Sequence, residues 1–97
     1  MLKKSEIDEL IKSSISEILE DSEQFDLSSY FIGAESSIES IDIVQIIASV
    51  EDKLEEKGIE GIDFLEKTFE HNNLKFTEFS DLIEKDAKIE VFDDGKN

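Results

Sequence analysis

The sequence contains no cysteine and no proline, and each absence limits what the chain can form. Without cysteine it has no disulfide, no thiolate metal site and no cysteine nucleophile. Without proline, and with only 4 glycines, the ends of its elements must be located from hydrophobic periodicity and capping residues. The chemistry open to the chain is therefore that of its hydroxyl, carboxylate, amine and imidazole groups.

Long apolar runs and basic residues are also scarce. No apolar run approaches membrane-spanning length, and charged residues directly after Met1-Leu2 leave no secretory signal pattern. We therefore expect a cytoplasmic protein that does not insert into a membrane. With 26 acidic against 10 basic residues, the formal net charge is −16. This charge argues against nucleic-acid partners and favours basic patches on partner proteins, although acidity also serves solubility alone.

The length of 97 residues favours one domain, residues 1–97, with a single core and no deep enclosed active site. Carboxylates are abundant, but none stands in a pattern with a nucleophile or base. The only histidine, His71, lies near a predicted helix end and is interpreted as a surface residue. A single histidine among scattered acids is no metal pattern, and no calcium-loop spacing occurs. We expect neither catalytic nor metal-binding residues, so the protein is not predicted to be an enzyme.

Helical periodicity predicts an all-α bundle of three main helices and one short helix. The first helix is expected over residues 5–20, with Ser5 and Asp8 as a capping pair. A long loop follows over residues 21–39, held to the body by its aromatic side chains. The second helix is expected over residues 40–57, with Gly58 as its C-terminal cap.

In the later part of the chain, the same periodicity predicts two more helices. A short one is expected over residues 62–71, with Ile62, Leu65 and Phe69 on one face. The last begins at Thr77, interpreted as its N-cap, and the helical body ends near residue 85. The tail, residues 86–97, either docks on the body or frays. The apolar residues expected to point inward from the last helix are Phe79, Leu82 and Ile83, and the tail adds Ile89, Val91 and Phe92.

The second helix has two apolar stripes. At 100° per residue, the stripe of Ile43, Ile46, Ile47, Val50 and Leu54 forms the predicted core face. Ile41, Val44 and Ala48 fall on a different side, and the remaining face holds Asp42, Ser49, Asp52 and Glu56. The second stripe either packs under the long loop or forms an exposed docking surface with an acidic rim.

Ser40 stands where this helix begins, and two interpretations apply to it. Serine is a common N-cap, because its hydroxyl accepts a hydrogen bond from a free N–H of the first turn. The same free N–H groups, together with the helix dipole, also favour a phosphate group at this position. Helix physics alone favours the capping role.

The residues around Ser40 resemble the attachment motif of acyl carrier proteins, an Asp-Ser-Leu followed by an acid and an apolar helix. The likeness is carried by residues 38–47 (IESIDIVQII) and continues through residues 50–54 (VEDKL). Upstream, residues 31–33 and 36–37 are similar to a subgroup with an extended loop. Downstream, residues 76–83 look like the family's last helix. The resemblance covers roughly residues 5–85 in the family's helix order.

This resemblance implies that Ser40 accepts 4′-phosphopantetheine from a phosphopantetheinyl transferase. The thiol of that arm would carry acyl intermediates as thioesters, which fits a chain without its own sulfur nucleophile. The implied partners are the transferase and the acyl-loading and acyl-transfer enzymes with basic docking patches, and the protein is expected to be a monomer. The implied partner-binding residues are Glu39, Ile41, Asp42, Val44, Ala48, Asp52 and Glu56.

The sequence departs from the family pattern in three places, and the last of them, a longer segment, indicates a specialised carrier. Glu39 replaces the usual Asp, Gln45 replaces a common acid, and the segment over residues 58–76 is longer than in fatty-acid-synthesis carriers. The alternative function is a carrier-like acidic interaction module that is not modified. Ser37 and Ser36 begin weaker copies of the motif, but neither is followed by the right helical pattern, so Ser40 is preferred.

Overall fold

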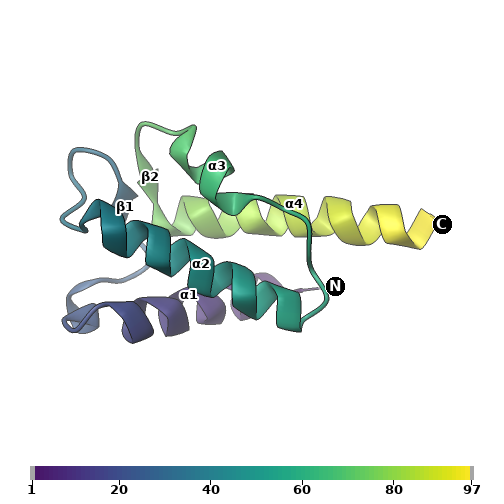
Figure 1. Ribbon diagram of the computed structural model, residues 1–97, viewed down its shortest axis with the longest axis horizontal. Coiled ribbons are helices and arrows are strands. Elements are labelled where there is room, and N and C mark those ends of the chain that lie inside the picture. The colour runs from purple at the N-terminus through teal and green to yellow at the C-terminus, as the bar shows by residue number, and fades with distance from the viewer. Residues whose placement is uncertain (1, 97) are drawn as a thin grey trace.

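The chain folds into four α-helices with a small two-stranded sheet at one end (Figure 1). The computed structural model describes the backbone of residues 2–96 and the side chains of residues 2–87. The elements in chain order are α1 (Lys4–Ile18), the 3₁₀ helix η1 (Ser22–Gln24), β1 (Tyr30–Ile32), α2 (Ser40–Glu56), α3 (Phe64–Phe69), β2 (Leu74–Lys75) and α4 (Phe76–Lys96).

The sheet corrects the all-α prediction, since β1 and β2 pair in antiparallel fashion with Tyr30 opposite Lys75 and Ile32 opposite Leu74. Two further backbone bonds extend the pairing, including one of 2.8 Å from the Thr77 N–H to the Leu27 carbonyl. Strands of two and three residues show too little alternation for sequence patterns to reveal them. The segment expected to be a loop thus contains both η1 and β1, and β1 ties it to the start of α4.

Gly33 marks the point where β1 ends and the chain turns toward α2. Its φ is +120°, a backbone conformation that residues with a side chain rarely adopt. A Cβ at this position would lie 2.4 Å from the side-chain oxygen of Asn73. Glycine is therefore required both by the turn and by the close approach of the segment preceding β2.

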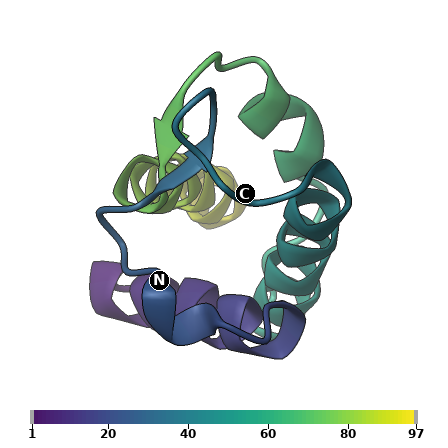
Figure 2. The same cartoon turned by 90° about the vertical axis from the view of Figure 1, so that its left-hand side faces the viewer.

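The core lies between α1, α2, α4 and β1, which Figure 2 shows surrounding it when viewed from the sheet end. The Phe31 ring of β1 is fully buried and stacks on Phe76, with ring centroids 4.6 Å apart. It also packs against Phe79 at 5.0 Å. The prediction that aromatic side chains hold the loop to the body is confirmed for Phe31. The predicted core stripe of α2 is buried in full: Ile43, Ile46, Ile47, Val50 and Leu54.

The helix ends differ from several predictions. The N-cap of α1 is Lys3, whose backbone N–H donates to the Glu6 carboxylate at 3.0 Å, so Ser5 is not the cap. Helix α4 begins at Phe76, one residue before Thr77, because the chain enters it directly from β2. At the far end α4 continues through Lys96, past the predicted boundary near residue 85. The predicted docking of Ile89, Val91 and Phe92 concerns side chains outside the described residues.

Helix α3 is shorter than predicted. Asp63 caps it by accepting the Glu66 N–H at 3.0 Å, so the helix begins at Phe64. The side chains it buries are Phe64 and Thr68. Leu65 and Phe69, predicted to share a face, are 36% and 47% exposed.

Candidate functional site

Ser40 is the first residue of α2, and its side chain is exposed. The N-cap is the extended residue before it, Glu39, whose carbonyl accepts the Ile43 N–H at 3.0 Å and closes the first turn. The interpretation of Ser40 as the N-cap is therefore wrong. No side chain caps this helix end, and the first N–H groups of a helix have no acceptor within it. The structure thus leaves the hydroxyl accessible beside an uncapped helix N-terminus.

The two competing serines have different environments. The Ser36 hydroxyl is half-buried, donates to the Phe31 carbonyl at 2.9 Å and accepts the Ile38 N–H at 3.2 Å. It supports the turn between β1 and α2, and this role leaves it poorly placed for modification. Ser37 is exposed but precedes the helix, away from its N-terminal N–H groups.

The second apolar stripe of α2 is on the surface. Ile41 is 65% exposed, Val44 is 41% exposed and Ala48 is exposed as well. The interpretation that this stripe packs under the long loop is therefore wrong. Apolar side chains of this size in the solvent beside Ser40 are typical of a contact surface.

Helix α3 adds two exposed apolar side chains, Leu65 and Phe69. The Glu51 carboxylate of α2 accepts the Phe64 N–H at 2.9 Å. Glu51 lies three residues after Ala48 and seven after Val44, so this contact places both on the flank of α2 nearest α3.

The opposite flank of α3 faces α4. There the Lys67 ammonium lies 3.6 Å from the Asp86 carboxylate, so Leu65 and Phe69 point away from α4. We call the five exposed residues on the two helices the α2–α3 apolar surface: Ile41, Val44, Ala48, Leu65 and Phe69.

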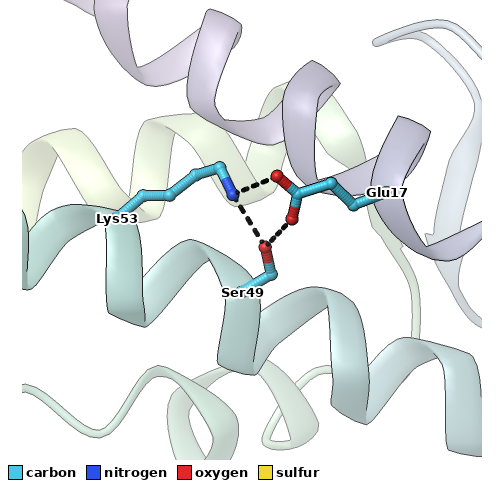
Figure 3. A network of polar contacts seen from close by, with 3 residues as sticks. All are labelled: Glu17, Ser49 and Lys53. Atoms are coloured by element: carbon cyan, nitrogen blue, oxygen red, sulfur yellow. Dashed lines mark hydrogen bonds and ion pairs between the residues drawn. The ribbon is translucent and has the colours of Figure 1, made fainter.

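The other flank of α2 is tied to α1 by the network in Figure 3. The Glu17 carboxylate accepts the Lys53 ammonium at 2.8 Å and the Ser49 hydroxyl at 3.0 Å. These hydrogen bonds, that of Lys53 first, hold the pKa of Glu17 below its usual value. The resulting stability is present above the pKa of the unfolded chain and is lost as the pH falls through the lowered value. Ser49 was predicted on the face of α2 that holds Asp42, Asp52 and Glu56, and the structure places its side chain in the contact between α1 and α2.

The predicted acidic rim does not form one patch. Asp42 is half-buried on the α1 side of α2, where it lines a depression of about 570 Å³ with residues 18–21. Asp52 and Glu56 are exposed but lie roughly 18 and 24 Å beyond Ser40 along the helix axis. The exposed Glu66 and Glu70 of α3 instead accompany Leu65 and Phe69. Of the predicted partner-binding residues, only Glu39, Ile41, Asp42 and Val44 lie within about one turn of Ser40.

Other kinds of site find no support in the described part of the chain. Among residues 2–87, no three His, Cys, Asp or Glu side chains are arranged to hold a metal ion. His71 is exposed, as predicted. None of the helices within residues 2–96 combines the length and apolar character needed to cross a bilayer. Comparisons with protein-family models, with curated proteins and with solved structures found no match to this chain.

Proposed function

We propose that the protein is an acyl carrier that presents Ser40 for covalent attachment of 4′-phosphopantetheine. The observation that carries the proposal is an exposed serine at the first position of α2, free of any capping role, beside exposed Ile41 and Val44. A long loop, a core-forming α2, a short α3 and a final helix follow the order implied by the resemblance. Partner enzymes would meet the α2–α3 apolar surface.

The residues at the start of α2 fit a phosphodiester. Its negative charge would lie at the positive end of the helix dipole, near N–H groups that no side chain caps. Glu39 and Asp42 oppose this charge in part, and they also offer contacts to a basic transferase. When bound, the cofactor supplies the thiol that this cysteine-free chain lacks.

In the modification step, Ser40 Oγ attacks the phosphorus that bears the pantetheine in coenzyme A. A new Oγ–P bond forms, the pyrophosphate P–O bond breaks and adenosine 3′,5′-bisphosphate leaves. The hydroxyl proton passes to a base on the transferase. The chain itself only has to present the hydroxyl in the open, which the exposed first position of α2 provides.

Incubation with a broad-specificity transferase and coenzyme A should add one phosphopantetheinyl group to the protein. Ser40→Ala should abolish the mass increase, whereas Ser37→Ala, the matched control at an exposed neighbouring serine, should keep it. Intact-mass and peptide-mass spectrometry read out both the extent and the position. Modification that survives Ser40→Ala, or that maps to Ser37, would show that the attachment site has been misassigned.

A second function remains, an interaction module of the same fold that is not modified. Glu39 in place of the family's Asp favours it, and the α2–α3 apolar surface suits both functions. A folded protein that gains no mass with any transferase tested would favour this module.

Charge reversal near Ser40 should slow the encounter with the transferase. Asp42→Lys is expected to lower the association rate roughly 3–10-fold, because it removes attraction to a basic surface close to the point of transfer. Glu56→Lys should lower it less, since Glu56 lies at the far end of α2. Added salt should slow the wild-type protein as well. Stopped-flow association rates give the measurement.

The control for net charge is Glu9→Lys, an exposed substitution on α1. If it slows association as much as Asp42→Lys, the effect is one of total charge only. Rates that are indifferent to all three variants and to salt would mean that the acidity serves solubility.

A further inference from the structure

Few side chains hold helix α3 to the body, among them Lys67, whose ammonium lies 3.6 Å from the Asp86 carboxylate of α4. The helix has six residues, too few to be stable as an isolated helix, so it depends on tertiary contacts. Its buried side chains are Phe64 and Thr68, while Leu65 and Phe69 are partly in solvent. Phe64 is therefore the one large apolar side chain of α3 that the closed position buries fully.

Thr68 opposes that position. Its side chain is fully buried, and its hydroxyl has no hydrogen-bond partner among the residues that the structure describes. A buried hydroxyl without a partner loses its bonds to water and gains none in return. Closing α3 over the core therefore carries a built-in cost that offsets part of the gain from burying Phe64.

Hydrogen bonds at its start and the adjoining strand after its end hold α3 in the closed position. At its start, Glu51 accepts the Phe64 N–H and Asp63 accepts the Glu66 N–H. After its end, β2 pairs with β1, and Asn73 packs against Gly33. Beside the first end lies an open pocket of about 350 Å³, lined by residues from the end of α2, by residues 59–63 and by Phe64.

We propose that α3 is a lid that opens locally while α1, α2 and α4 stay folded, and that its opening withdraws Phe64 from the core and from the wall of this pocket. Opening also moves Leu65 and Phe69 out of the α2–α3 apolar surface. A partner bound to that surface selects the closed form, so partner binding and opening of the lid oppose each other. The lid does not depend on modification of Ser40 and is tested on the unmodified protein.

Native-state amide hydrogen exchange, measured residue by residue under conditions where reclosing is faster than exchange, tests the lid. In the wild type, α3 amides should exchange faster than those of Ile47 and Val50, which report global unfolding. Thr68→Val keeps the shape and removes the hydroxyl, so it should slow α3 exchange by about five-fold or more. Glu51→Ala should speed it, because the anchor on Phe64 is lost.

The matched control is Ser14→Ala, which removes the other fully buried hydroxyl without a partner, on α1. Because α1 stays folded when the lid opens, this variant should slow exchange at Val50 and leave α3 unchanged. Ile11→Val should speed exchange at Val50 and again leave α3 unchanged. If α3 and Val50 change together in either control, α3 opens only by global unfolding. That result would overturn the proposal that α3 opens as a lid. The proposal would also be overturned if Thr68→Val did not slow exchange of the α3 amides.

Discussion

Truncation of Ile47 to alanine is expected to destabilise the protein by about 2–5 kcal/mol. Ile47 is 1% exposed on the core stripe of α2, so the change removes buried methylene groups and leaves a cavity among well-packed neighbours. Small domains have a total stability of roughly 5–15 kcal/mol, so this loss is a large share of the whole. Thermal melts followed by circular dichroism measure it directly.

The same truncation at Ile41 is the matched control, since it removes the same atoms from the same helix at an exposed position. Ile41→Ala should change stability by less than about 0.5 kcal/mol. It should nevertheless reduce the rate at which the transferase modifies Ser40, because Ile41 adjoins that serine. If Ile41→Ala destabilises the fold as much as Ile47→Ala while modification stays normal, the exposed stripe is ordinary core in solution.

The second large effect is expected at Phe31, where substitution by alanine should cost about 3–5 kcal/mol. The ring is fully buried and contacts Phe76 and Phe79, so its loss removes both apolar burial and two aromatic contacts. Because Phe31 holds β1 against α4, the loss also loosens the approach to Ser40. Urea unfolding gives the free energy, and the modification rate of the remaining folded protein reports on the loop.

Phe69→Ala is the control for residue type, with a ring that is 47% exposed on α3. It should cost far less stability than Phe31→Ala but weaken binding of partners that use the α2–α3 apolar surface. Equal losses of stability in the two variants would contradict the placement of Phe69 on the surface. A partner affinity that Phe69→Ala leaves unchanged would remove α3 from the docking site.

The parts of the fold that sequence predicted well are the long amphipathic helices. Over the length of α2, a stripe such as Ile43, Ile47 and Leu54 has only one helical face on which to lie, and the structure buries it. In α3, by contrast, three of six residues are large and apolar. Periodicity then gives no unique face, and the choice is made by the cap at Asp63 and the contact from Glu51.

In the candidate site, too, some features could be predicted from periodicity and others depend on tertiary contacts. The position of Ser40 at a helix start could be predicted because the apolar pattern begins there. The neighbours that cover each flank of α2 could not be predicted, because periodicity describes one helix and says nothing of its surroundings. For example, the helical wheel placed Ser49 on the face of α2 that holds several acids, whereas in the structure its hydroxyl donates to Glu17 of α1.

The pairing of Tyr30 with Lys75 has a consequence for the order in which the molecule assembles. These strands lie far apart along the chain, with all of α2 and α3 between them, so their contact closes a long loop and forms slowly compared with the helices. During synthesis, the turn before Ser40 gains its partner strand only after residue 75 has left the ribosome. A nascent chain that ends within α3 would therefore present the serine on a helix whose preceding segment is still untethered. If modification requires that segment in place, the protein becomes a substrate only after residue 75 has emerged.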